Sequence, residues 1–277
     1  MRAFLVNLKN KTPFLLYLWS LQQKIKGKRH LKKYSDKEAI NKLYKEYSGK
    51  TPKIQTPTTF SEKLQWLKLN VQDPLMTTTA DKWEVRAYLK TKGYGHLLST
   101  VISVHDTLLD FDIKKLPKKF VVKATHGSGW NLICTDKEKI NWFWWKKIMN
   151  VWLTNNIFWP GREWQYKHMK PRLIVEEFLV DDSGCLMDYK FFCFNGKVKF
   201  VQTNKDRDTQ DHVQNFYDLD WNVLPFGKDL KPKPEVLIAP PLCLQEMVVI
   251  AEDLSEKFPF VRVDFYEVNK KIIFGEM

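Results

Sequence analysis

The feature that most restricts the fold is a pair of β-rich runs joined by a two-residue turn in the last third of the chain. Residues 189–194 and 197–203 are rich in aromatic and β-branched side chains, and Asn195-Gly196 separates them. An Asn-Gly pair between two such runs is the strongest short-range signal for a β-hairpin, because both residues tolerate positive φ angles. An antiparallel sheet is therefore expected in this part of the chain.

Other segments indicate helices and further strands. A helix is expected over residues 35–47, the pattern Thr59-Phe-Ser-Glu62 is an N-capping box that begins another, and the two prolines of residues 51–57 indicate a linker between them. We predict further helices at about residues 79–92, 136–154 and 244–257, and strands at 120–125, 132–135, 172–179, 260–266 and 271–274. Helices mixed with hairpin-linked strands predict an α+β fold in two or three lobes.

Composition excludes several classes of protein. Hydrophobic residues make up 44% of the 277 residues and aromatic residues 14%, which excludes an intrinsically disordered chain. The four cysteines, Cys134, Cys185, Cys193 and Cys243, form no C-x-x-C pair. A disulfide scaffold or a cysteine-rich zinc site is therefore not expected, and a reducing cytoplasm is the simplest location.

The net charge of +13 is concentrated at one end of the chain. Residues 1–50 hold 13 Lys and Arg against 3 Asp and Glu, a net of +10, which leaves +3 for all the others. A nucleic-acid-binding protein would carry its basic residues over the folded surface. Nucleic acid is therefore not an expected partner.

The same end carries an apolar run, Phe14 to Trp19, flanked by the basic residues Lys9, Lys11, Lys24, Lys26, Lys28 and Arg29. This run is too short to span a bilayer, which needs roughly 20 apolar residues. One interpretation is a helix packed on the domain with a solvated basic tail. The other is a peripheral segment, within residues 1–34, that rests on the anionic inner face of a membrane.

A glycine-containing loop between two predicted strands is a candidate phosphate site. The segment Lys123-Ala-Thr-His-Gly-Ser-Gly-Trp-Asn131 delivers a lysine on a strand and then a flexible turn. Backbone N–H groups of such a loop can surround phosphate oxygens, and the ammonium group can neutralise their charge. The loop lacks the G-K-[ST] element of a Walker motif, so a hairpin turn with an incidental lysine explains it equally well.

Carboxylates gather at strand positions further along the chain. Glu176 and Glu177 end one predicted strand, and Asp188 and Lys190 share one face of the next because side chains alternate. In the last predicted hairpin, an odd number of connecting residues would put Arg262, Asp264 and Glu276 on one face. Two carboxylates with an arginine suit Mg²⁺ and a phosphoryl group, whereas the simpler alternative is an exposed hairpin with an Arg–Asp pair.

Taken in order, these segments resemble the TupA-like branch of the ATP-grasp proteins, which is linked to teichuronopeptide and cell-surface polysaccharide synthesis. The resemblance covers roughly residues 55–277. It is carried by Thr59 to Lys68, Asp81-Lys82 with Val85-Arg86, Phe120 to Asn131, Gly161 to Tyr166, Glu176-Glu177, Asp188 to Gly196, Asn215 to Asp220 and Phe258 to Tyr266.

The resemblance implies an ATP-grasp fold in which two α+β lobes clamp a nucleotide, preceded by a helical extension. It implies segments 1–50 (basic extension), 51–116 (N-terminal subdomain), 117–179 (lobe with the glycine loop) and 180–277 (lobe with the Mg²⁺ site). Lys82 and Lys123 would contact the phosphates of ATP. The flap over them would be formed by His126, Gly127, Ser128 and Gly129, and the adenine would be held by Glu176, Glu177, Phe178 and Leu179.

The resemblance also assigns the reacting end of the nucleotide. Lys190 would approach the terminal phosphates, Arg262 would lie near the transferred group, and Asp264 with Glu276 would bind Mg²⁺. The implied enzyme is a carboxylate–amine ligase that works through an acyl phosphate, with a carboxylate-bearing glycan or an amino acid as substrate. Residues expected on the acceptor side are Arg162, Gln165, Tyr166, Lys170 and Arg172. Similar proteins continue beyond such a glutamate with a Thr- and Gly-containing segment, so a truncated C-terminus with impaired activity is expected.

Two other functions stay open from the sequence. A glycosyltransferase-like enzyme would use a D-x-D metal motif, and that spacing occurs at Asp206–Asp208 and Asp218–Asp220. A non-catalytic ATP-grasp module could instead bind a membrane edge through the basic N-terminus.

Overall fold

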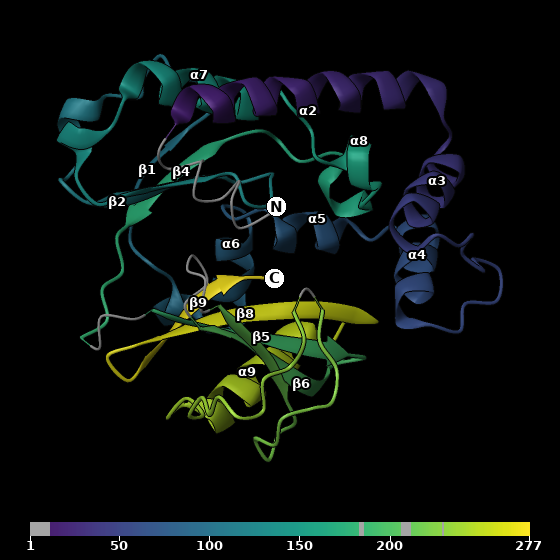
Figure 1. The fold of residues 1–277 in the computed structure, drawn as a ribbon. Helices are drawn as coiled ribbons and strands as arrows, with labels where there is room; N and C mark the ends of the chain where they lie inside the picture. Colours follow the sequence, from purple (N-terminus) through teal and green to yellow (C-terminus); the bar gives the residue numbers. More distant parts are fainter. Residues whose placement is uncertain (1–11, 183–185, 206–211, 229) are drawn as a thin grey trace. The chain divides into compact units, whose positions relative to one another are not determined.

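The computed structural model describes residues 12–182, 186–205, 212–228 and 230–277, which fall into two compact units. The four-stranded unit contains residues 12–85 and 101–178, and the five-stranded unit contains residues 86–100 and the described part of 179–277 (Figure 1). Each unit is built around one antiparallel sheet. The four segments predicted from the sequence stay predictions.

The four-stranded unit has the strand order β1-β4-β2-β3, from β1 (Val101–His105), β2 (Phe120–Ala124), β3 (Asn131–Cys134) and β4 (Leu173–Glu177). Its helices are α2 (Pro13–Lys33), α3 (Asp36–Ser48), α4 (Phe60–Asn70), α5 (Pro74–Ala80), α7 (Trp142–Leu153) and α8 (Phe158–Gly161), with short 3₁₀ turns η2 (Ile113–Lys115), η3 (Lys137–Lys139) and η4 (Trp164–Tyr166). Phe120, Val122 and Val175 of the sheet form a fully buried core with Ile148 and Met149 of α7.

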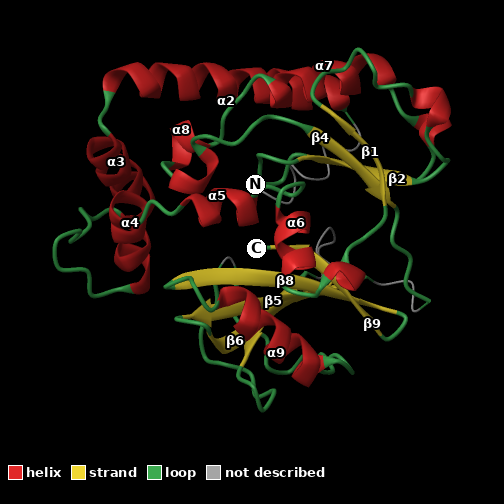
Figure 2. Ribbon diagram, turned by 180° about the vertical axis from the view of Figure 1, so that it is seen from behind, coloured by secondary structure: helices red, strands yellow, loops and turns green. Residues whose placement is uncertain are grey.

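The five-stranded unit has the order β7-β6-β5-β8-β9, from β5 (Met187–Phe194), β6 (Lys197–Lys205), β7 (Val213–Tyr217), β8 (Phe260–Val268) and β9 (Lys271–Glu276). Helix α9 (Leu244–Ser255) packs on β5, β6 and β8 (Figure 2). Cys193 of β5 faces this helix, since its thiol donates to the carbonyl of Ala251 at 3.8 Å. Helix α6 (Val85–Thr91) begins at the boundary of the two units, and the turn η1 (Gly95–Leu97) follows.

The turn and cap predictions are confirmed. Asn195 and Gly196 have φ angles of 49° and 72°, and they join β5 to β6. Glu62 accepts hydrogen bonds from the backbone N–H groups of Thr59, Thr58 and Lys53. These bonds hold the predicted linker of residues 51–57 against the start of α4. These backbone donors lower the pKa of Glu62 to about 2.

The helix predicted over residues 79–92 is wrong, because the chain forms two short helices there. α5 ends at Ala80 and α6 begins at Val85. The carboxylate of Asp81 between them accepts from the backbone N–H groups of Trp83 and Glu84, at 2.8 and 3.2 Å. A side chain that satisfies the free donors of a new helix start ends the preceding helix.

The helix predicted over residues 136–154 is shorter than expected. Residues 137–139 form η3, and α7 begins only at Trp142, after Asn141 caps it by accepting from the N–H of Trp144. Strands β1 and β7 were not predicted. Both are five-residue strands at the edge of a sheet.

Helix α2 contains the apolar run noted in the sequence and packs on α7. Within the described ranges, no helix combines enough length with enough apolarity to cross a bilayer. Lys9 and Lys11 lie outside the described residues.

Candidate nucleotide and metal site

A row of charged side chains crosses three strands of the five-stranded sheet. Lys190 of β5 is the direct cross-strand partner of Asp264 on β8, and its ammonium lies 2.5 Å from Asp264 Oδ2. The same ammonium lies 2.6 Å from Asp188 Oδ2, two residues earlier on the same face. Lys190 and Asp264 are only 6% and 2% exposed. The predicted sharing of a face by Asp188 and Lys190 is therefore confirmed.

The β8–β9 hairpin brings Arg262 and Glu276 to this row, but by a route that the sequence did not predict. The turn between Val268 and Lys271 holds two residues, Asn269 and Lys270, so the expected odd connection is absent. A β-bulge at Gly275 changes the register, and Asp264 then pairs with Glu276. A turn of two residues followed by one bulge places the later side chains on the same face as a turn of three residues would. Arg262, Asp264 and Glu276 therefore share a face, as predicted.

Arg262 bridges the two carboxylates. Its Nε lies 2.6 Å from Asp264 Oδ1, and its Nη2 lies 2.8 Å from Asp264 Oδ2 and 3.1 Å from Glu276 Oε1. Burial by itself lowers the pKa of the Arg262 guanidinium, but the carboxylates of Asp264 and Glu276 raise it overall, so the charge is retained. The Arg–Asp pair of the simpler alternative is present, but Asp264 is buried, so the hairpin is not exposed at this position.

The pair Asp264 and Glu276 fits the ligand chemistry of Mg²⁺. No group of three or more His, Cys, Asp and Glu side chains suited to a metal occurs in the described part of the chain. Mg²⁺, however, is commonly bound by one or two carboxylates together with waters and substrate phosphates. One cationic nitrogen, Arg262 Nη2, already reaches both carboxylates, so a single cation at this edge can be shared by the pair.

Amide side chains extend the row across β6 and β7, and sequence reasoning missed them. Gln202 and Asn204 stand opposite Lys190 and Asp188, and Gln214 stands opposite Asn204. Asn204 Oδ1 accepts from Gln214 Nε2 at 3.2 Å. All three amides are at least 95% buried. The Asn195-Gly196 turn alone would put Val201 opposite Lys190, and a bulge at Lys199 shifts the register so that Gln202 stands there instead. The turn signal in the sequence was therefore not sufficient to find these amides.

In the four-stranded unit, the predicted phosphate lysine on β2 pairs with the predicted adenine-side glutamate on β4. Lys123 Nζ lies 2.6 Å from Glu176 Oε2, with 26% of the lysine side chain and 9% of the glutamate side chain exposed. Glu177 ends β4 and is half-buried, as are Phe178 and Leu179 after it. Strands β2 and β4 thus place two of the predicted site residues in direct contact.

The glycine loop is anchored at its start and exposed at its tip. His126 is 3% exposed, and its Nε2 lies 2.8 Å from the carbonyl of Trp152. Burial lowers the pKa of His126, so the ring is neutral at pH 7. Ser128 and Gly129 are exposed, and Gly129 has a φ of 70° that favours glycine.

Two further contacts fix the loop. Lys82 donates from its ammonium to the carbonyl of Gly127 at 2.7 Å, so a predicted phosphate lysine touches the predicted flap. A Cβ atom on Gly127 would lie 2.3 Å from the indole of Trp130, which excludes any larger residue there. The structure therefore brings together Lys82, Lys123, Glu176 and residues 126–129 in one unit, and Lys190, Arg262, Asp264 and Glu276 in the other.

The residues expected on the acceptor side are less available than the sequence suggested. Arg162 is 1% exposed and lies against Asp36, with 3.3 Å between its Nε and the carboxylate. Arg172 Nη1 lies 2.7 Å from Glu84 Oε1, and Lys170 pairs with Asp106. Gln165 and Tyr166 are half-buried in η4. Arg162 is thus a structural residue that holds α8 against the start of α3.

The D-x-D spacing at Asp218–Asp220 belongs to a turn. Asp218 accepts from the backbone and side-chain nitrogens of Asn222, at 2.8 and 3.0 Å. The side-chain hydrogen bond of Asn222 lowers the pKa of Asp218. Asp206–Asp208 lies outside the described residues.

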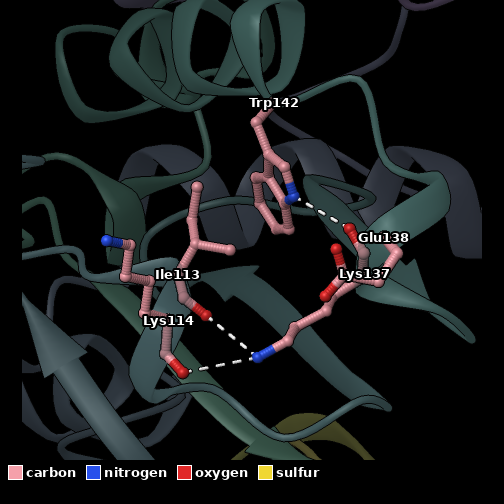
Figure 3. A pocket seen from close by; sticks show the side chains of 5 residues that line it. All are labelled: Ile113, Lys114, Lys137, Glu138 and Trp142. Atoms are coloured by element: carbon pink, nitrogen blue, oxygen red, sulfur yellow. Dashed lines mark hydrogen bonds between the residues drawn. The ribbon is translucent and has the colours of Figure 1, made fainter.

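A pocket of about 330 Å³ in the four-stranded unit does not involve the predicted site residues. It is lined by Ile113, Lys114, Lys137, Glu138 and Trp142 (Figure 3). The ammonium of Lys137 donates to backbone carbonyls, most closely that of Leu116 at 2.6 Å, and the indole of Trp142 donates to the carbonyl of Lys137. The ammonium of Lys137 is therefore already hydrogen-bonded within the protein.

Solved structures similar to this chain are ligases with low sequence identity. They include PsnB, an ATP-grasp ligase complexed with a minimal precursor (9% identity, TM-score 0.40, covering 78% of this chain and 58% of that chain). D-alanine–D-alanine ligase from Bacillus anthracis (15%, 0.40, 72% and 55%) and phosphoribosylamine–glycine ligase from Thermotoga maritima (14%, 0.43, 80% and 57%) also match. The chain thus covers less than two thirds of each.

The family comparison is more extensive. Among curated proteins, no relative matches the chain. The family described as TupA-like ATPgrasp matches residues 62–277. Since this range includes both sheets and every predicted site residue, the family and the α+β ATP-grasp fold predicted from the sequence are confirmed: the chain belongs to the TupA-like ATP-grasp family.

Proposed function

We propose that the chain is an ATP- and Mg²⁺-dependent ligase that joins a carboxylate to an amine or a similar nucleophile. The family supports ATP-dependent ligation, and the charged row of the five-stranded sheet is the observation that carries the proposal. The row contains three carboxylates, Asp188, Asp264 and Glu276, against the two cations Lys190 and Arg262. The carboxylates supply the oxygen ligands that Mg²⁺ prefers, and the two cations suit phosphate oxygens.

In this proposal Asp264 and Glu276 hold Mg²⁺, which when bound supplies charge neutralisation for the phosphate oxygens of ATP. Lys190 and Arg262, which contact these carboxylates, would supply charges that suit the transferred phosphoryl group. Lys82 and Lys123 contact the phosphates, residues 126–129 cover them, and residues 176–179 hold the adenine. Of the acceptor residues, Arg162, Lys170 and Arg172 keep only a positioning role, since their charges are paired.

The proposed reaction has two steps. A carboxylate oxygen of the substrate attacks the γ-phosphorus, ADP leaves with the electron pair of the broken P–O bond, and an acyl phosphate forms. The amine then attacks the acyl carbon, phosphate leaves, and the amine loses a proton. The contribution of the protein is positioning and charge neutralisation. We propose cell-surface polysaccharide or teichuronopeptide-type synthesis as the setting, with a carboxylate-bearing glycan or an amino acid as substrate.

The cytoplasm is the proposed location of the reaction. Cys134, Cys193 and Cys243 are free thiols, and burial raises the pKa of Cys193 to about 11. Unreactive free thiols suit a reducing compartment.

The test is ATP binding by isothermal titration, followed by ADP release with uronic-acid glycans and amino acids as substrates. Lys123→Gln and Glu276→Gln should each weaken MgATP binding or turnover at least about tenfold, because each removes one charge beside the phosphates or the ion. The matched controls are Lys119→Gln and Glu235→Gln, which change exposed residues outside the proposed site. A chain that binds no MgATP, or variants that behave like their controls, would overturn the proposal.

A further inference from the structure

Helix α2 exposes an apolar face at its N-terminal half. Phe14, Leu15, Leu18 and Trp19 are 40–45% exposed, and Ile25 is 50% exposed. The opposite side of the helix is occupied, since Leu16, Ser20 and Gly27 are buried. With about 100° per residue, the exposed apolar residues lie within one half of the helix circumference. The helix is thus held on the protein by one side and presents hydrophobic side chains on the other.

The C-terminal half of the same helix face is cationic. Lys26, Lys28, Arg29 and Lys33 are exposed, and at about 100° per residue they fall on the same half of the circumference as the apolar residues. None of the 21 residues of α2 is acidic. Apolar and cationic groups therefore follow each other along one exposed face, with no negative side chain of the helix to compensate them.

Helix α7, which lies beside α2 in both ribbon views, extends this surface (Figures 1 and 2). Phe143 of α7 is 62% exposed. Its ring and the ring of Phe14 each lie 4.9 Å from Trp144, and the ammonium of Lys147 lies 4.8 Å from the Phe143 ring. Aromatic rings with an adjacent lysine suit the boundary between headgroups and acyl chains, where one end is apolar and the other is hydrated.

We propose that the α2–α7 face, made of Phe14, Leu15, Leu18, Trp19, Ile25, Lys26, Lys28, Arg29, Lys33 and Phe143, binds the surface of an anionic lipid bilayer. The apolar residues would enter the interface, and the basic residues would pair with lipid phosphates. The proposal concerns a peripheral contact, and it does not depend on the ligase activity, since this face contains none of the proposed site residues.

The charge pattern favours a bilayer over other occupants. A protein partner that offers only an apolar patch would leave the cationic half of α2 without a counter-charge. A soluble polyanion would leave the exposed apolar half in contact with water. An anionic bilayer satisfies both halves at once, because its surface attracts cations and its interior accepts apolar side chains. One interpretation of the sequence is a membrane contact somewhere within residues 1–34, and the present proposal assigns this contact to the residues of the α2–α7 face.

The test is co-sedimentation of the full chain with phosphatidylcholine vesicles, with and without about one-third phosphatidylglycerol. Binding should require phosphatidylglycerol and should weaken in about 1 M salt, where the Debye length falls to about 3 Å. The apolar variant is Leu18→Ser/Trp19→Ser, with Leu109→Ser, a 97% exposed leucine elsewhere, as its control. The charge variant is Lys26→Gln/Lys28→Gln/Arg29→Gln, with the exposed Lys50→Gln/Lys63→Gln/Lys119→Gln as its control.

We expect each α2 variant to bind at least about tenfold more weakly than its control. For the charge variant the reason is that each cation near an anionic surface contributes about a fivefold factor. Equal binding to both vesicle types, or α2 variants that bind like their controls, would overturn the proposal. Loss of binding in the charge variant alone would show that attraction to the lipid phosphates is sufficient, and it would overturn the insertion of the apolar residues. Because the changed residues are exposed, circular dichroism should show unaltered helix content in every variant.

Discussion

Lys190 is buried between two carboxylates. Its ammonium contacts Asp188 and Asp264, and Asp264 is also bonded by Arg262. A buried charge is costly unless it is paired and hydrogen-bonded. The contacts of these side chains therefore keep the row stable before any nucleotide binds, and they also place the charges that the proposed reaction needs.

The first prediction follows from this pairing. Lys190→Met should lower the free energy of unfolding by about 3 kcal/mol or more, because it leaves Asp188 without its ammonium and Asp264 with one cation fewer. Urea unfolding measures the change, and the double variant Asp188→Asn/Lys190→Met should recover part of it. The control is Lys197→Met, whose ammonium also lies 2.6 Å from a carboxylate but is 66% exposed, and which should cost less than about 1 kcal/mol. Equal losses in both lysine variants would contradict the interpretation.

A second prediction concerns His126 and pH. Burial lowers the pKa of His126 in the folded chain, so the unfolded chain takes up the proton more readily near its ordinary value of about 6.5. The stability contributed by the neutral ring is therefore present above about pH 6.5 and is lost as the pH falls below it, by at most about 1.4 kcal/mol per pH unit.

Urea unfolding between about pH 5 and 7.5 checks this sign across the ordinary histidine pKa. His126→Gln should flatten the dependence of stability on pH, whereas His96→Gln, which changes an exposed histidine, should leave it as in the parent chain. A parent profile that is flat in this range would contradict the prediction.

At the scale of elements, the β8–β9 hairpin depends on Gly275. A Cβ atom at this position would lie 3.0 Å from the carbonyl oxygen of Asp264 and 3.2 Å from the ring of Tyr266. Both neighbours belong to the paired strand, so the added atom would push β9 away from β8 and displace Glu276. The bulge is therefore the point where strand pairing controls the position of a proposed Mg²⁺ ligand.

Gly275→Ala should accordingly destabilise the chain by about 1–3 kcal/mol, the usual cost of overpacking, and should raise the Mg²⁺ concentration needed for half-maximal ADP release. Gly27→Ala in the interior of α2 is the control. Its Cβ would meet nothing closer than 3.9 Å, and alanine is favoured over glycine in a helix by roughly 0.5–1 kcal/mol. If the Gly275 variant showed an unchanged Mg²⁺ dependence, the claim that the bulge positions a Mg²⁺ ligand would be contradicted.

Local signals predicted most elements, and the failures have physical causes. The Asn195-Gly196 turn and the capping box at Thr59 are local interactions, so the sequence contains them completely. The break at Asp81 was missed because an aspartate can equally extend a helix or cap the next one. Strands β1 and β7 were missed because each has only five residues and no glycine-containing turn signal adjoins it, unlike the glycine loop beside β3.

The candidate site was predictable to a similar degree. Side-chain alternation predicted that Asp188 shares a face with Lys190, and the order of motifs predicted the family. The cross-strand pair of Lys190 with Asp264 depends on pairing between β5 and β8, which are far apart in the sequence. The amides of β6 face the row because of a bulge at Lys199, which the turn signal does not predict. The burial of Arg162 was equally hidden, since it results from packing among α3, α8 and the end of α2.

At the scale of the whole molecule, ligand binding should raise the stability of the chain. If MgATP binds only the folded state, a concentration of 100 times Kd adds about 2.7 kcal/mol, which corresponds to a rise in Tm of roughly 5 °C for a chain of this size. Differential scanning fluorimetry with ATP plus Mg²⁺, and with ATP plus EDTA, measures the effect. Glu276→Gln should lose the part that depends on Mg²⁺, and an equal rise in EDTA would contradict the role given to the carboxylates.

The bulge at Gly275 also restricts how this hairpin can change in length. If β9 were regular at Gly275, this glycine would pair with Asp264 and Glu276 would turn to the other face of the sheet. Deleting Gly275 would instead remove the bulge and leave Glu276 opposite Asp264. Loss of this one residue is therefore expected to preserve the facing of Glu276, whereas a substitution that straightens the strand would reverse it.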